Sequence, residues 1–146
     1  MNFITVFSTV ISGVLVYIIG QILNQFFIEK IIKQRETFGK ISDALIMYAN
    51  LYTDPIESNT QISRKEERNE AQQIFRNLAC ELLSRSYQIP VYKVISGFKI
   101  TPKKKNIMEA HHNLIGLSNS VFTRDSWIEH NLRRKKEIEE SLKLIS

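Results

Sequence analysis

The chain begins with a long uncharged segment, and this segment limits what the rest can fold into. From Phe3 to Ile28, 26 residues pass without an Asp, Glu, Lys or Arg, and all 20 basic and 15 acidic residues lie after them. A helix of this length rises about 39 Å, which exceeds the roughly 30 Å hydrocarbon core of a bilayer. The sequence therefore predicts a transmembrane helix at residues 1–28 and a second domain at residues 29–146.

Two other interpretations of this segment are weaker. A cleaved signal peptide needs a basic start and a small-x-small cleavage site, but Asn2 and Phe3 follow Met1 directly and no such site follows the apolar run. A buried core helix is the second alternative, and 26 uncharged residues exceed what a small soluble domain usually hides. We therefore expect a single-pass membrane protein.

The flanking charges predict the orientation. Lys30, Lys33, Arg35 and Lys40 follow the segment, while its other flank is only the amino terminus. The positive-inside rule then places the N-terminus outside and the C-terminal domain in the cytoplasm. A single cysteine, Cys80, fits a reducing compartment. We expect a bacterial inner membrane.

The predicted membrane helix is not apolar all round. At 100° per residue, one side gathers small and polar residues, namely Thr5, Ser8, Thr9, Ser12, Gly13, Val16, Gly20 and Asn24. Such residues let membrane helices approach closely and hydrogen-bond to one another. The stripe either packs helix on helix or lines a narrow pore with Asn24 at its cytoplasmic mouth. Both interpretations require a homo-oligomer, because one stripe is not expected to satisfy itself in lipid.

The remainder of the chain has the pattern of an antiparallel helical bundle. The membrane helix is expected to continue beyond residue 28. There an apolar seam recurs at heptad spacing, namely Ile31, Phe38, Ile41, Leu45, Tyr48 and Tyr52, with Gln34 at the one polar position. This seam either packs subunits together as a coiled coil or packs on later helices of the same chain. The seam ends at Thr53-Asp54-Pro55, before a polar loop. The predicted class is all-α, one N-terminal transmembrane helix continuing into a cytoplasmic bundle.

Three further helices follow from local signals. Ser63-Arg64-Lys65-Glu66 matches a capping box and opens a helix that runs to Tyr87. Its apolar face is Ala71, Ile74, Phe75, Leu78, Ala79, Leu82 and Leu83. Residues 91–96 form a strand or single helical turns. Thr101 as N-cap and Pro102 at the first position open the next helix, whose inner face carries Ile107, His111, Leu114, Ile115, Ser118, Val121 and Phe122. After a turn at residues 123–126 the last helix begins, and it carries Trp127, Ile128, Leu132, Ile138, Leu142 and Ile145.

The sequence predicts no catalytic, cofactor or metal site. Nucleotide-binding glycine loops, H-E-x-x-H and paired CxxC motifs are missing. His111 and His112 are adjacent, so on a helix they point about 100° apart and cannot clamp one metal together. His111 lies on the apolar face and is expected to be a hydrogen-bonded core or interface residue. The chain is predicted to be a binder or an effector, not an enzyme.

Lysines cluster where a helix is predicted to start. Lys99 to Lys105 include four lysines and no acid, and Lys103, Lys104 and Lys105 oppose the macrodipole of the helix that they open. An anion would resolve that conflict. Together with Arg133 and Arg134, these residues are either solvated or near anionic lipid headgroups, or they bind a nucleotide or short nucleic acid. The flanking aromatics fit base stacking: Tyr87, Tyr92, Phe98 and Trp127.

Three segments carry a family resemblance. VYIIGQILNQFFIEKI, YANLYTDP and LIGLSNS at residues 114–120 resemble a family of small bacterial membrane-anchored proteins of uncharacterised function. In LIGLSNS we expect tight packing at Gly116 and a bond from Asn119 to backbone in a buried turn. The layout is similar to membrane effectors of antiphage operons, the Hailong type among them. That resemblance implies an effector that permeabilises the membrane and is gated by an oligonucleotide from a partner enzyme.

Two functions are therefore predicted. The first is an oligomeric membrane effector, a pore or channel gated by an anionic nucleotide or oligonucleotide, as in antiphage defence. The alternative is a membrane-tethered scaffold that uses the apolar seam and the bundle to hold a protein partner at the membrane.

Overall fold

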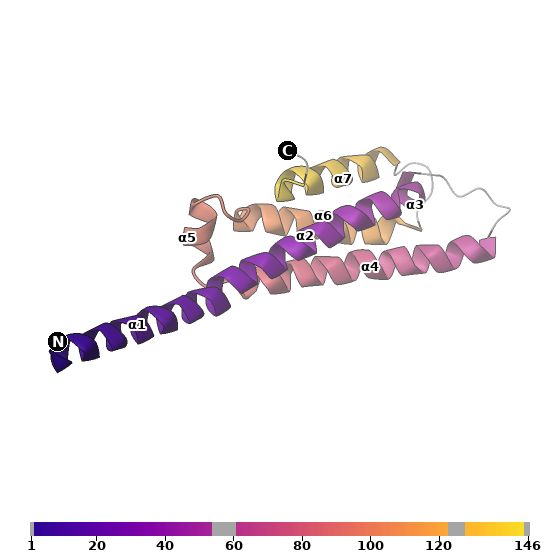
Figure 1. Cartoon of the computed structure of the whole chain (residues 1–146). Helices are drawn as coiled ribbons and strands as arrows, with labels where there is room; N and C mark the ends of the chain where they lie inside the picture. Colours follow the sequence, from indigo (N-terminus) through magenta and orange to yellow (C-terminus); the bar gives the residue numbers. More distant parts are fainter. Residues whose placement is uncertain (1, 54–60, 123–127, 145–146) are drawn as a thin grey trace.

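The computed structural model describes residues 2–53, 61–122 and 128–144, and every element in these ranges is helical. The elements are α1 (Phe3–Leu23), the π-helix η1 (Asn24–Ile28), α2 (Glu29–Met47), α3 (Ala49–Thr53), α4 (Gln61–Tyr87), α5 (Tyr92–Gly97), α6 (Lys104–Ser120) and α7 (Ile128–Leu142). The predicted all-α class is confirmed: a long apolar helix precedes a helical bundle (Figure 1).

One unbroken rod joins the N-terminal segment to the bundle. Residues Phe3–Met47 form a helix of 45 residues through α1, η1 and α2, and such a helix rises about 68 Å. Its apolar part is the candidate membrane span found among the described residues, with none of its most apolar window buried. α1 projects from the end of the bundle, whereas α2 lies within it (Figure 1). The predicted continuation of the first helix is thus confirmed.

The junction of the two parts is a π turn that the sequence did not predict. In η1 the Glu29 N–H donates to the carbonyl of Asn24, five residues back. π turns inside α-helices are rare and occur frequently at functional sites. This one begins at Asn24 and ends at Ile28, where the uncharged segment ends.

The apolar seam of α2 and α3 is used within the chain. Ile41, Leu45, Tyr48 and Tyr52 are all buried against the other bundle helices. The Phe75 ring of α4 meets the rings of Tyr48 and Tyr52 edge-on at centroid distances of 6.0 and 6.3 Å. The seam therefore packs on the chain's own helices, which decides between the two predicted uses.

The remaining helices complete one core. α6 packs against both α4 and α7, and α4 packs against α2. The predicted apolar faces of α4 and α6 are confirmed in the buried set Ala71, Phe75, Leu78, Ala79, Leu82, Ile107, Leu114, Ser118 and Val121. Two predicted core residues, Phe122 and Leu132, are instead exposed. The prediction for Trp127 lies outside the described residues.

Two predicted helix starts are wrong. α4 begins at Gln61, so Ser63 lies inside the helix and does not cap it. α6 begins at Lys104 with Lys103 as its N-cap, so Thr101 and Pro102 precede the helix. Tertiary contacts override the local signal here, because side chains of α2 and α5 hold the backbone of residues 100–102 in place. Residues 92–97 form helical turns rather than a strand.

The LIGLSNS segment packs closely, as predicted, through a different set of contacts. A Cβ at Gly116 would lie 2.6 Å from Nε of Arg134, so α7 approaches α6 closely at this glycine. Asn119 is exposed, and its Oδ1 accepts a hydrogen bond of 2.9 Å from Arg76 of α4. The expected bond from Asn119 to backbone in a buried turn is therefore replaced by a bond between side chains.

A buried arginine joins three helices at the end of the bundle away from α1. The Arg68 guanidinium of α4 donates to the carbonyl of Leu51 at 3.2 Å and to the carbonyl of Val121. Asn131 of α7 donates to the carbonyl of Tyr52 at 3.1 Å. Helix ends leave carbonyl groups without intrahelical partners, so these side chains satisfy the ends of α3 and α6 inside the core.

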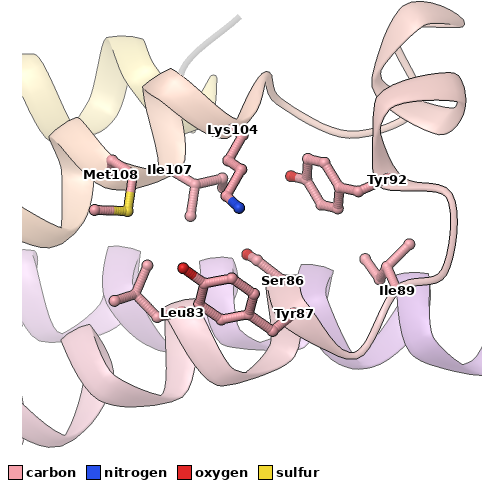
Figure 2. A pocket seen from close by; sticks show the side chains of 8 residues that line it. All are labelled: Leu83, Ser86, Tyr87, Ile89, Tyr92, Lys104, Ile107 and Met108. Carbon is pink, nitrogen blue, oxygen red and sulfur yellow. The ribbon is translucent and has the colours of Figure 1, made fainter.

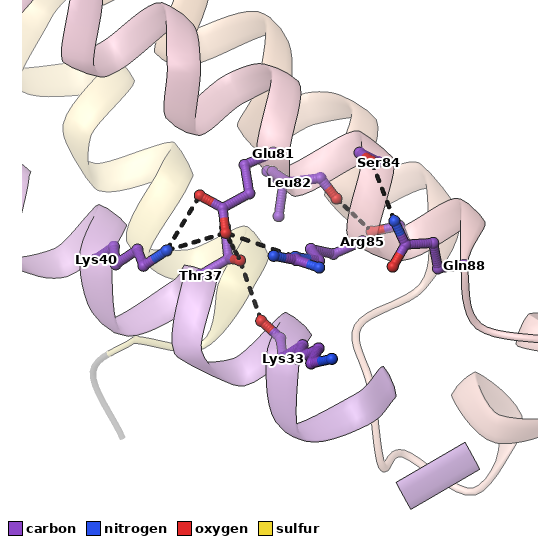
Figure 3. Close-up of polar contacts among 9 residues, drawn as sticks. Lys33, Thr37, Lys40, Glu81, Leu82, Ser84, Arg85 and Gln88 are labelled. Atoms are coloured by element: carbon purple, nitrogen blue, oxygen red, sulfur yellow. Dashed lines mark hydrogen bonds and ion pairs between the residues drawn. The ribbon is translucent and has the colours of Figure 1, made fainter. Parts of the chain in front are cut away.

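A polar cluster joins α2 to α4 (Figure 3). Glu81 accepts hydrogen bonds from Lys40 at 3.0 Å and Thr37 at 3.1 Å, and Arg85 lies 3.5 Å away. Burial is the largest single influence on the pKa of Glu81 and raises it, but these hydrogen bonds and charges together outweigh it, so the pKa lies below its usual value of 4.5.

Removing the buried arginine should destabilise the fold. We expect Arg68→Leu to lower the free energy of unfolding by about 2–3 kcal/mol. The carbonyls of Leu51 and Val121 would lose their charged donor, and at least one of them would stay buried without a hydrogen-bond partner. Urea denaturation of the full chain in detergent micelles, followed by circular dichroism, measures this. Lys65→Leu, at an exposed position of α4, is the control. Equal stability of the two variants would contradict the assignment.

The Glu81 cluster should make stability depend on acid. Folding lowers the pKa of Glu81. Its contribution to the free energy of unfolding is therefore complete above the pKa that Glu81 has in the unfolded chain, and it is lost as the pH falls through the pKa in the folded chain. Glu81→Gln should lower the free energy of unfolding at neutral pH by about 1 kcal/mol and flatten its decline below pH of about 4.5. The control is Glu140→Gln, whose exposed pair with Lys136 spans 3.8 Å. Identical acid profiles of Glu81→Gln and the unmodified chain would rule this out.

Candidate anion-binding pocket

The predicted small and polar stripe lies along α1, and part of it is satisfied within the helix. The Thr9 hydroxyl donates to the carbonyl of Thr5 at 2.9 Å, and the Ser12 hydroxyl donates to the carbonyl of Ser8 at 2.8 Å. These hydroxyls therefore do not by themselves require a partner helix, contrary to the expectation above. Gly13 and Gly20 have open space beside them, with no atom within 4 Å of an added Cβ.

The predicted basic residues do not form a single cluster in the structure. Lys103, Lys104 and Lys105 are exposed around the start of α6, and Nζ of Lys104 lies 4.7 Å from the Tyr87 ring centroid. Arg134 of α7 donates to the carbonyl of Gly116, at 3.3 Å. Because Gly116 lies twelve residues after Lys104, the two clusters are about 18 Å apart along α6.

Arg133 and Arg134 are partly committed to contacts within the bundle. Arg133 pairs with Glu137 at 3.7 Å and lies 3.4 Å from Nδ1 of His130. Arg134 donates to Oδ1 of Asn131 at 3.3 Å in addition to its carbonyl contact on α6. Arg134 therefore serves the packing of α7 on α6, whereas both of these contacts of Arg133 lie within α7.

Lys99 is the predicted site residue that lies in a built basic pocket. The pocket has a volume of about 340 Å³ and opens between the start of α2, the segment that joins α5 to α6, and the end of α7. Its described lining residues include three cations and no carboxylate: Arg35, Phe38, Lys99, Ile100, Thr101, Pro102, Leu142, Lys143 and Leu144. We call this the basic pocket.

Two of its cations occupy unusual backbone positions. Lys99 has φ of 60° and Lys143 has φ of 56°, each directly after the last turn of a helix. The Lys143 N–H donates to Glu140 and the Leu144 N–H donates to Glu139, which is the Schellman pattern. Glycine usually takes this left-handed position. Here two helix ends instead place lysines on one pocket, and neither side chain has a polar partner among the described residues.

A buried hydroxyl also belongs to the basic pocket. Thr101 is 5% exposed, and its Oγ1 has no hydrogen-bond partner among the described residues. Its neighbours are fixed from two sides: Arg35 donates to the carbonyl of Ile100 at 3.2 Å, and the Tyr92 hydroxyl donates to the carbonyl of Pro102 at 2.8 Å. An unpartnered buried hydroxyl costs about 1–3 kcal/mol, and because Oγ1 itself is inaccessible to solvent, a partner reaches it only if the lining of the pocket shifts.

The basic pocket is coupled to the N-terminal rod through neighbouring residues of α2. Gln34 Nε2 donates to the Ser86 hydroxyl at 2.9 Å and to the Tyr92 hydroxyl at 3.2 Å. Tyr92 in turn holds Pro102. The backbone before α6 is therefore held by Gln34 through Tyr92 and by Arg35 directly, which ties that segment to the helix leading to α1.

A smaller pocket is lined in part by Tyr92 (Figure 2). It has a volume of about 100 Å³ and lies between the end of α4, α5 and the start of α6, lined by Leu83, Ser86, Tyr87, Ile89, Tyr92, Lys104, Ile107 and Met108. The hydroxyls of Ser86 and Tyr92 are already bonded to Gln34, and Lys104 lies over the Tyr87 ring. The groups that would recognise a polar ligand are thus occupied.

Nothing in the described part of the chain forms a metal centre. His111 is half-buried, and its Nδ1 lies 3.0 Å from the carbonyl oxygen of Ala79 on α4, so the predicted hydrogen bond is confirmed at the contact of α6 with α4. Cys80 is exposed on α4. Neither His111 nor Cys80 lines the basic pocket.

Sequence reasoning missed Arg35, Thr101 and Lys143 as site residues. Arg35 and Lys143 lie 108 positions apart in the chain, and only the packing of α2 beside α7 brings them to one pocket. The sequence carries no local signal for that juxtaposition. Thr101 was identified, but as a helix cap.

Comparison with known proteins adds no relative from which a role can be transferred. No protein-family model, no curated protein and no solved structure matches this chain. The resemblance carried by LIGLSNS therefore stays a prediction, and function has to be argued from the residues themselves.

Proposed function

We propose that this chain is an oligomeric effector of a bacterial inner membrane, in which α1 forms or gates a pore and the basic pocket binds a phosphate-bearing ligand. The observation that supports it most directly is that Arg35, one of the pocket's cations, belongs to the same continuous helix as the candidate membrane span. A ligand that draws Arg35, Lys99 and Lys143 together acts on that helix directly.

The chemistry of the pocket favours phosphate. Guanidinium groups bind phosphate oxygens through paired hydrogen bonds, and lysine adds a mobile point charge. Arg35, Lys99 and Lys143 provide three positive charges, and Thr101 provides a hydroxyl. A nucleotide or short oligonucleotide carries the complementary negative charge. With the bundle in the cytoplasm, an enzyme encoded in the same operon is the expected source of such a ligand.

The rod offers a route from the ligand to the membrane. α2 runs without interruption into η1, and η1 begins at Asn24 of the polar stripe. A π turn converts to an α turn by a change in backbone hydrogen bonding, and this change rotates α1 about its axis relative to α2. Such a rotation changes which residues of α1 face the neighbouring subunits, and opens or closes the pore.

The scaffold alternative receives less support from the fold. It relied on the apolar seam as a docking surface, but Ile41, Leu45, Tyr48 and Tyr52 are buried inside the bundle. A partner protein would need another surface.

Glycine at the two lysine positions should separate binding from stability. In Lys99→Gly and Lys143→Gly, relief of the left-handed backbone is worth about 1 kcal/mol, and the lost attraction of lysine for the helix C-terminus costs about 0.3–1 kcal/mol. Stability should therefore stay nearly constant. Affinity should fall about tenfold for each lysine, since a charge-assisted hydrogen bond contributes roughly 1.5 kcal/mol or more.

Fluorescence anisotropy with a labelled, terminally phosphorylated short DNA oligomer measures this affinity, with inorganic phosphate as competitor. Lys136→Gly on α7, outside the basic pocket, is the control for general charge. If Lys136→Gly weakens binding as much as the pocket variants do, the DNA is bound by net charge and the pocket is not the site.

Conduction is tested separately, with the purified full chain in a planar bilayer. We expect a current that the oligomer changes, and we expect Asn24→Leu to reduce the conductance while crosslinking still shows the same oligomer, because the amide would no longer line the opening. Ile18→Leu, on the apolar side of α1, is the control. If the bilayer carries no current although reconstitution of the protein has been verified, the chain does not form a pore. If the current of Asn24→Leu is unchanged, Asn24 does not line the pore.

A further inference from the structure

The short helix α5 exposes an unusual amount of apolar surface. Phe98 is 75% exposed, Val91 60% and Val94 55%, and Ile100 further along is also exposed. In the same stretch only Ile95 is a fully buried apolar side chain. Val94 and Phe98 are four residues apart and lie on the same side of α5. A soluble domain rarely leaves such residues together in water without a partner.

The apolar surface lies in a segment that is uniformly basic. From residue 82 to residue 108 the chain has no Asp or Glu, and its six charged residues are Arg85, Lys93, Lys99, Lys103, Lys104 and Lys105. Exposed aromatic and aliphatic side chains with lysines around them are the composition of elements that lie at an anionic bilayer surface. An acidic protein partner would satisfy the lysines, but the place of α5 in the fold favours the bilayer.

α5 lies across the end of the bundle from which α1 departs (Figure 1). Gln34 bonds to Tyr92 of α5, and Arg35 bonds to Ile100, directly after it. Gln34 and Arg35 follow Ile28 by six and seven residues, which is about 10 Å along the rod. The headgroup layer on each side of the hydrocarbon core is about 5–8 Å deep. With α1 in the membrane and Ile28 at the edge of the hydrocarbon core, the residues that hold α5 lie just outside the headgroup layer, so side chains of α5 on the membrane side reach the headgroups.

We propose that α5 and its flanks form a second membrane contact, in which the side chains of Val94 and Phe98 enter the headgroup layer. Lys93, Lys103 and Lys105 then lie among anionic headgroups of the same leaflet. This inference rests on the proposed membrane span of α1, and it goes beyond it because it fixes the bundle against the bilayer. The basic pocket beside α5 then opens next to the membrane surface.

Tryptophan quenching by brominated lipids tests the contact in the full chain. Trp127 is the single native tryptophan, and Trp127→Phe provides a silent background. Phe98→Trp reports on α5, Tyr17→Trp reports on the middle of α1, and Met47→Trp, 70% exposed at the far end of α2, is the control. The proteins are reconstituted in vesicles of phosphatidylcholine and phosphatidylglycerol.

Phe98→Trp should lose at least half of its emission when the bromine atoms lie near the headgroup end of the acyl chains, and less when they lie deeper. Tyr17→Trp should show the reverse order, and Met47→Trp should not change. If Tyr17→Trp is quenched but Phe98→Trp is quenched no more than Met47→Trp, the α5 contact is refuted while the membrane span stands. If Tyr17→Trp is not quenched, the span itself fails, and this inference fails with it.

Discussion

The architecture depends on one helix that has to satisfy two environments. Between Phe3 and Ile28 the rod is uncharged and unburied, whereas from Gln34 onward it provides a face of the bundle core. Because backbone hydrogen bonding continues through η1, neither part changes direction without affecting the other. Every other helix is therefore positioned relative to α2, and through α2 relative to α1.

The polar contacts of α2 are concentrated where this constraint is greatest. Gln34, Arg35 and Thr37 lie within one turn, and they bond to α4, to α5 and to the segment that precedes α6. Partly buried Phe38 packs on the core after this turn, and the buried apolar side chains of α2 begin at Ile41. Hydrogen bonds depend on direction more strongly than apolar contacts do. This polar turn of α2 therefore determines how α4, α5 and the segment before α6 are oriented relative to the N-terminal helix. The basic pocket uses the same turn.

The long-range pattern of the sequence was informative because it reports burial, which a helix repeats every three to four residues. The uncharged segment, the seam from Ile41 to Tyr52 and the apolar faces of α4 and α6 were predictable for that reason. Helix ends were not. Thr101-Pro102 has the composition of a helix start, yet contacts from Arg35 and Tyr92 hold it outside α6. The basic pocket was predictable only through Lys99, since Arg35 and Lys143 meet by packing alone.

The placement of cations is what distinguishes this bundle from one shaped only by stability. Lys99 and Lys143 take left-handed positions that glycine occupies more easily, and Lys104 lies where a helix start favours a carboxylate. At Lys99 and Lys143 the helix C-terminus attracts the positive charge, but the left-handed backbone conformation is unfavourable for lysine. At Lys104 the helix dipole repels the positive charge. Lys104 is compensated by the Tyr87 ring. The other two have no such partner among the described side chains, and an anion in the basic pocket supplies one for both.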